Sequence, residues 1–161
     1  MADKEHYQEI ARILAKEVEG LRQLLEVVEQ EKQLLLAGSP EDLVPVSEQK
    51  LAICRRLEEL KAERTRAMER AGLDPASPAA LEELIRWAPS SQRQGLKALV
   101  DKARAIARTV ARVGENNKRY LQEALDTVDK LLAILTGTDQ PQGYGHHPPR
   151  ALGPRLVAKE V

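Results

Sequence analysis

Residues 7–35 read YQEIARILAKEVEGLRQLLEVVEQEKQLL, and this stretch decides the fold class. One apolar residue recurs every seven positions along it: Tyr7, Leu14, Leu21, Val28 and Leu35. The alternate positions of this seam hold Ile10 and Leu24, but also Glu17 and Glu31. Further apolar residues flank the seam and widen it, which is typical of a helix that packs in a bundle.

The first helix is predicted over residues 3–37 and should end at Gly38, because glycine tolerates the left-handed conformation of a helix cap. The remaining apolar stripes predict three more helices: residues 40–71, 78–88 and 92–136. The connection at Gly38 is short, so the first two helices should be antiparallel neighbours. Pro45 has no N–H to donate, and we expect a kink or a late helix start there.

The composition agrees with long helices. Leu, Ala, Glu, Arg and Lys make up more than half of the 161 residues, while aromatic residues make up 2%. We therefore expect an all-α fold: an elongated antiparallel three-helix bundle or coiled coil, with a short helical insert before a long third helix. Residues 1–137 form the helical domain in this prediction. Residues 138–161 hold four Pro and three Gly without helical periodicity, which predicts a flexible tail.

Catalytic and metal-binding patterns are missing from the sequence. The chain has three His and one Cys, and we find no Gly-rich phosphate loop, nucleophile elbow or Cys/His cluster. We expect no catalytic residues, no metal site and no cofactor. The apolar runs are far shorter than the roughly 20 residues of a membrane helix, and no apolar signal core begins the chain. These features predict a cytoplasmic protein without membrane insertion.

Residues 93–119 are locally basic, with eight Lys or Arg against two acidic residues. Arg104, Arg108 and Arg112 share one helix face at four-residue spacing. Such a stripe fits a nucleic-acid binder, but it also fits a solvated face opposite the acid-rich first helix. Zero net charge and the shortage of aromatic rings favour the second interpretation, and we expect no nucleic-acid partner.

The far part of the last helix has a broad apolar face. This helix is about 44 residues long against about 35 and 32 for the others, an excess on the order of 15 Å that should extend past the Gly38 turn. Uncovered apolar surface would suit an amphipathic helix of a partner. The alternatives are that the first helix or the short helix covers this face, or that a second copy pairs there in a homodimer. The candidate binding residues are Asn117, Tyr120, Leu121, Ala124, Leu125, Val128, Leu131, Leu132 and Leu135.

Several motifs of the C-terminal third resemble one known family. They are Asn117-Lys-Arg-Tyr-Leu121, Leu131-Leu-Ala-Ile-Leu-Thr-Gly137, Gly143-Tyr144-Gly145 and Leu156-Val-Ala-Lys-Glu-Val161. With the Leu/Glu-rich first helix they resemble the FlgN family of flagellar type III export chaperones. The family often has two Asn three residues apart, whereas here Gly114 stands at the first position and Asn116 lies nearby.

The resemblance implies a function and partners. It implies a non-catalytic chaperone that binds C-terminal amphipathic segments of the hook–filament junction proteins FlgK and FlgL. The chaperone would keep them from associating prematurely and present them to the export gate. Tyr144, flanked by glycines, is the only aromatic residue after Tyr120. The resemblance suggests that Tyr144 docks on the gate protein FlhA, and the alternative is that it packs back near Leu135.

Overall fold

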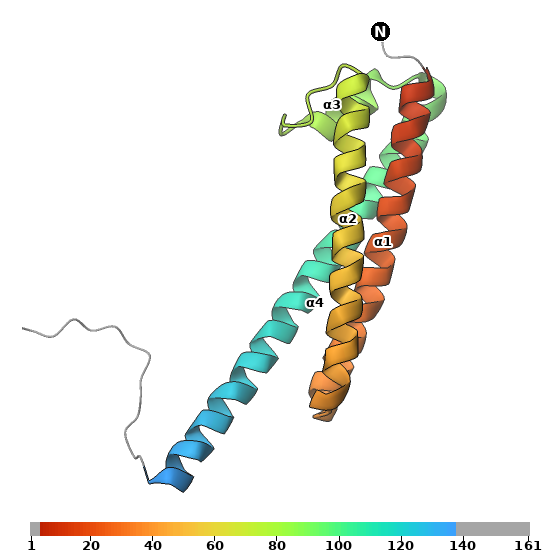
Figure 1. Ribbon diagram of the computed structural model, residues 1–161. Helices are drawn as coiled ribbons and strands as arrows, with labels where there is room; N and C mark the ends of the chain where they lie inside the picture. The colour runs from red at the N-terminus through yellow and green to blue at the C-terminus, as the bar shows by residue number, and fades with distance from the viewer. Residues whose placement is uncertain (1–3, 138–161) are drawn as a thin grey trace, which may run out of the picture. The chain divides into compact units, whose positions relative to one another are not determined.

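The computed structural model describes residues 4–137, and these are helical with short connections. The elements in chain order are α1 (Lys4–Ala37), the 3₁₀ turn η1 (Pro40–Asp42), α2 (Leu43–Arg70), α3 (Ala80–Trp87) and α4 (Ser90–Thr136) (Figure 1). The predicted all-α fold of antiparallel helices with a short insert is confirmed. The predicted tail, with Tyr144, lies outside the described residues, and the domain boundary at residue 137 stays a prediction.

Glycines end three of the helices, as their positions predict. Gly38, Gly72 and Gly137 have φ angles of 67°, 75° and 66°, the left-handed region that other residues avoid. At the first of these, the N–H of Ser39 donates to the carbonyl of Leu34 at 3.1 Å, which satisfies a free carbonyl at the end of α1. The chain then reverses into η1 and α2.

The second helix begins late, which confirms one of the two expectations for Pro45. A 3₁₀ turn occupies residues 40–42, and the α-helix starts at Leu43. Pro45 consequently falls in the first turn of α2, where backbone N–H groups have no partner within the helix. Its missing N–H therefore interrupts no helical hydrogen bond.

Helices α1 and α2 lie side by side (Figure 1) and run antiparallel. Gly20 lies in the interior of α1, and a Cβ built on it would come within 2.8 Å of the Leu57 side chain of α2. A glycine in mid-helix weakens helix formation. Here it permits the close approach of α2 to α1.

The largest core cluster lies where α3 meets the beginning of α1, the end of α2 and the beginning of α4. Its most buried members are Ile10, Leu60, Met68, Leu84, Leu96 and Val100. A second cluster, around Leu24, Val28 and Val113, joins α1 to the middle of α4. The side chain of Gln92 donates to the carbonyl of Lys4 at 3.4 Å, so α1 and α4 start together. The beginning of α1 thus contacts the beginning of α4, and a later part of α1 contacts the middle of α4. Helices α1 and α4 therefore run in the same direction, opposite to α2.

The chain divides into two compact units after Leu125. The first unit, residues 1–125, contains α1, α2, α3 and the part of α4 that packs on them. The second begins at Asp126, and α4 continues without a break into it as far as Thr136. Helix α4 has 47 residues against 34 in α1 and 28 in α2, so it is the longest helix of the described residues, as expected.

Candidate functional site

The candidate site is an exposed apolar face on the last third of α4. Tyr120 is 40% exposed and Leu135 is 81% exposed, and the other predicted apolar residues are exposed as well. We call these eight residues the exposed face of α4: Tyr120, Leu121, Ala124, Leu125, Val128, Leu131, Leu132 and Leu135. They recur every three or four positions, so they lie toward one side of the helix. Four of them belong to the first unit and four to the second.

One apolar residue of this region was missed by the sequence analysis. Ile134 is 71% exposed, more than any large apolar residue of the exposed face except Leu135. It follows Leu131 by three positions and lies just outside the edge of the stripe, which did not include it. Near its end, α4 therefore presents apolar side chains around more of its circumference than a single stripe covers.

The buried part of α4 ends at Asn117. The residues of α4 that are fully shielded are Leu96, Val100, Val113 and Asn117. The next seam positions, beginning with Leu121, are exposed. Sequence analysis placed Asn117 with the binding residues, but its side chain is 3% exposed in this conformation. Asn117 therefore does not join the exposed face of α4, and it marks the place where that face begins.

Asn117 holds three helices together through polar contacts. Its Nδ2 donates to the carbonyl of Val28 at 2.8 Å and to Oε2 of Glu31 at 2.9 Å. The other carboxylate oxygen of Glu31 accepts from Lys50 Nζ of α2 at 2.5 Å. We call Asn117, Glu31, Lys50 and the Val28 carbonyl the polar junction. The amide N–H groups of Asn117 thus have the acceptors that buried donors need, whereas its Oδ1 is buried without a hydrogen-bond partner among the described residues.

A second acidic residue of the α1 seam is paired in the same way. Glu17 accepts from Nε of Arg64 of α2 at 2.9 and 3.1 Å. Burial raises the pKa of Glu17, although the Arg64 charge acts in the opposite direction. Both carboxylates in the apolar seam of α1 thus have a cation from α2. The signal for these pairs was the presence of Glu17 and Glu31 at seam positions, but sequence analysis assigned them no role.

The two positions near Asn117 that differ from the family pattern are unremarkable in packing. Nothing lies within 4 Å of a Cβ built on Gly114. The Asn116 side chain accepts a hydrogen bond from Arg119 at 3.2 Å and does not enter the polar junction.

The basic stripe of α4 is partly neutralised. Arg104 donates to Glu82 of α3 at 2.6 Å, and this hydrogen bond lowers the pKa of the Glu82 carboxyl. Lys97 pairs with Asp101 at 2.6 Å. These pairs show how two of the local cations are used, and whether the stripe binds nucleic acid stays untested.

Neither a cluster of metal ligands nor a membrane-spanning helix is found among the described residues. Among residues 4–137, no group of three or more His, Cys, Asp or Glu is arranged to hold a metal ion. Within the same range, no helix is both long and apolar enough to cross a membrane. The described residues show helix packing and an exposed apolar helix face.

Comparison with known proteins identifies the family. No curated protein and no solved structure matches the chain. The model of one protein family, described as FlgN protein, matches residues 1–147, which is most of the chain. The chain therefore belongs to the FlgN family, whose members are non-enzymatic flagellar export chaperones for FlgK and FlgL.

Proposed function

We propose that this protein is a cytoplasmic chaperone that binds the C-terminal amphipathic segments of FlgK and FlgL on the exposed face of α4. Bound there, the segments are kept from associating prematurely with each other or with other subunits. The chaperone then delivers them to the type III export gate.

The exposed face of α4 is the observation that carries this proposal. Its apolar residues recur at helical spacing and are exposed in the described protein. An amphipathic client segment has an apolar stripe of the same period, and contact between the two removes both from water. The family identifies the clients, and this face offers the type of surface that they require.

Reversible binding follows from the nature of such clients. An amphipathic segment that becomes helical on the chaperone loses conformational entropy as it binds. This loss offsets part of the free energy from apolar contact and keeps the affinity moderate. A moderate affinity suits a chaperone that must release its client at the gate.

The second part of the proposal assigns gate docking to Tyr144, which lies outside the described residues. An aromatic ring with a hydroxyl group combines a large apolar contact with a hydrogen bond, and it is favoured at protein interfaces. The family connects the chaperone with export, and we assign FlhA as the gate component that binds Tyr144.

A homodimer that uses the same face is the alternative. An exposed apolar stripe also fits a second copy of itself in a two-fold arrangement. The two functions predict different behaviour of the purified protein. A homodimer would already cover the exposed face of α4, and client would have to displace the second copy.

The proposal is tested with the purified full-length chain and with FlgK and FlgL from the same bacterium. Isothermal titration should show saturable binding of each client, and light scattering should show one client per chaperone. FlgK and FlgL that lack their C-terminal segments should not bind. Equal binding of the truncated clients would place the interaction elsewhere, and a client-resistant dimer would favour the alternative.

A further inference from the structure

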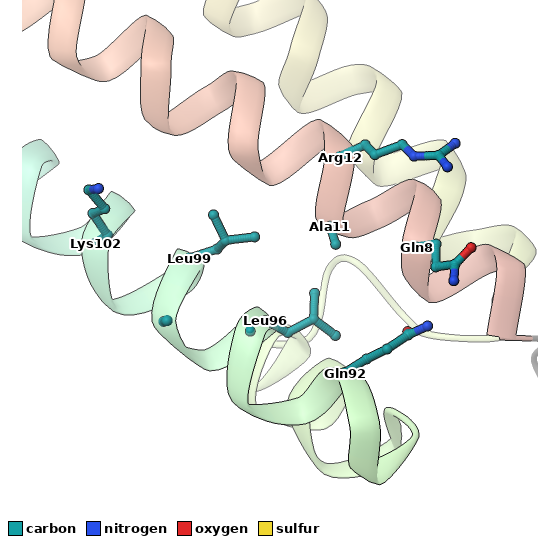
Figure 2. A pocket seen from close by; sticks show the side chains of 9 residues that line it. Gln8, Ala11, Arg12, Gln92, Leu96, Leu99 and Lys102 are labelled. Carbon is teal, nitrogen blue, oxygen red and sulfur yellow. The ribbon is translucent and has the colours of Figure 1, made fainter.

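A groove lies between α1 and the beginning of α4, within the first unit and apart from the exposed face of α4. It has a volume of about 700 Å³ and is open to solvent. Figure 2 shows Leu96 and Leu99 projecting from α4 toward Ala11 of α1. We call this the α1–α4 groove, and its lining residues are Gln8, Ala11, Arg12, Gln92, Gly95, Leu96, Ala98, Leu99 and Lys102.

The groove has an apolar floor and cationic margins. Arg12 lines it from α1 and Lys102 lines it from α4, and no Asp or Glu is among the lining residues. Neither cation forms an ion pair within residues 4–137. The neighbouring acids are used elsewhere, because Glu9 pairs with Arg70 and Asp101 pairs with Lys97, each at 2.6 Å. The groove therefore carries two positive charges that the described protein does not neutralise.

Gly95 lines the groove, and the internal packing does not require its missing side chain. Nothing lies within 4 Å of a Cβ built on this residue. Gly20 is different, since its missing side chain makes room for Leu57. Glycine is a poor helix former, so helix formation does not favour it at position 95. Its absent side chain permits the close approach of another backbone from outside.

We propose that the α1–α4 groove is a second docking site, which binds an acidic amphipathic helix of another protein. Apolar side chains of that helix lie on Leu99 and Ala11, which are half-buried. Its backbone passes close to Gly95, and its carboxylates pair with Arg12 and Lys102. The site uses none of the residues of the exposed face of α4, so it permits one partner in the groove while a client occupies that face.

The charges of the groove favour this occupant over a neutral or a basic helix. Cations beside a partly desolvated surface attract carboxylates and disfavour lysine at the same positions. A long apolar groove between two helices admits a third helix, which contacts both with residues spaced three and four apart. The position of the groove between two helices therefore suits a third helix, and the two cations favour an acidic one.

The probe is a synthetic fluorescent 21-residue peptide with Leu at helical spacing and Glu beside each Leu. Its twin carries Lys in place of every Glu. Fluorescence anisotropy with the full-length chain should show saturable binding of the acidic peptide. The twin should bind at least about tenfold more weakly, because its charges oppose those of the groove.

Two groups of variants locate the binding. Gly95→Leu fills the groove, and the double variant Arg12→Glu with Lys102→Glu reverses its charge; each should weaken binding at least about tenfold. Gly114→Leu is the matched control, since Gly114 is also an α4 glycine with open space around it. It should bind the acidic peptide normally. The double variant Leu125→Asp with Leu132→Asp should also bind the peptide normally, because its changes are expected to weaken the binding of FlgK and FlgL.

Several results would overturn the proposal. They are absence of peptide binding, equal affinity for the two peptides, and unchanged affinity in the Gly95→Leu variant. Loss of peptide binding in the double variant Leu125→Asp with Leu132→Asp would show that the peptide binds to the exposed face of α4 instead. A 20-base-pair DNA duplex that competed for the groove more tightly than the acidic peptide would make the ligand a nucleic acid. Circular dichroism melting of the Gly95→Leu variant should show a melting temperature at or above that of the unaltered chain.

Discussion

The side chain of Asn117 donates a hydrogen bond to the main-chain carbonyl of Val28 across 2.8 Å. This contact joins α4 to α1 at the last buried position of α4, and Glu31 and Lys50 extend it to α2. A polar side chain in an apolar seam fixes the register of the helices, because only one alignment gives its amide N–H groups these two acceptors. The polar junction thereby sets the point on α4 after which apolar residues are exposed.

Replacement of Asn117 by Ala should lower the free energy of unfolding by about 1–2 kcal/mol. Glu31 would lose a buried donor, and the space left by the amide would add to the loss. Urea unfolding followed by circular dichroism measures the change. Asn116→Ala is the control, and it should change stability by less than about 0.5 kcal/mol, because Asn116 does not enter the polar junction. Equal effects of the two variants would show that the junction adds no stability.

The burial of Glu17 beside Arg64 predicts a pH dependence of stability. Burial raises the pKa of Glu17 in the folded protein above its ordinary value of 4.5. When the pH rises between these two values, the unfolded chain loses its proton first, so stability declines. The decline begins near the ordinary value and is complete once the pH exceeds the raised one. Glu17→Gln cannot titrate, and its stability relative to the unaltered chain should rise over that interval.

Removal of Arg64 tests the other half of this pair. Arg64→Met should destabilise the protein by about 1–3 kcal/mol at neutral pH, because Glu17 keeps its charge without its hydrogen-bond donor. The loss should shrink in acid, when Glu17 becomes protonated. The double variant Glu17→Gln with Arg64→Met should be more stable at neutral pH than Arg64→Met alone. A loss of the same size at every pH would mean that packing of the Arg64 stem, and not its charge, stabilises the protein.

The close approach at Gly20 predicts opposite effects at two glycines. Gly20→Val should destabilise the protein by about 1–3 kcal/mol, because its branched side chain would collide with Leu57. Gly114→Ala should stabilise it by roughly 0.5–1 kcal/mol, because the new methyl group meets nothing and alanine favours the helix. Thermal unfolding measures both variants. A stabilising Gly20→Val would show that α2 moves away from α1 at little cost.

The helices could be predicted from the sequence because each depends on nearby residues. The apolar period of residues 7–35 and the glycine stops are local patterns, and the structure places the helix ends within a few residues of them. The exposed face of α4 followed from the same period. Partners across helices depend on register, which no local pattern contains. The identity of Arg64 as the partner of Glu17 could not be predicted for this reason.

Asn117 shows the same limit at the candidate site. Its position in the seam was evident, but its burial depends on the Val28 carbonyl and on Glu31, which approach it only after α1 and α4 pack. Ile134 shows a different limit. Stripe analysis selects residues on one side of a helix, whereas the end of α4 exposes apolar residues beyond that side.

Client binding should depend on the exposed face of α4 and not on exposed apolar residues in general. The double variant Leu125→Asp with Leu132→Asp should weaken binding of FlgK and FlgL by about 100-fold or more, because each Leu would otherwise be buried by the client. Its stability should be unchanged, since both residues are exposed. Isothermal titration measures the affinity.

The matched control for this variant lies on α2. Leu51 is 52% exposed, as is Leu132, and Val44 is exposed as well. The double variant Val44→Asp with Leu51→Asp introduces the same charges and should bind both clients normally. Equal loss in the two double variants would indicate a non-specific effect of added negative charge. Normal client affinity after the α4 changes would place the binding site elsewhere.

Tyr144 separates client binding from gate docking. If Tyr144 docks on FlhA, then Tyr144→Ala should leave the melting temperature and client affinity unchanged, but it should abolish binding to FlhA and slow FlgK export. Tyr144→Phe keeps the ring, so it should retain part of the binding and show how much the hydroxyl group contributes. If Tyr144 instead packs back on the helices near Leu135, the Ala variant should melt at a lower temperature. Normal stability together with normal export would leave Tyr144 without either role, because docking predicts slower export and packing on the helices predicts a lower melting temperature.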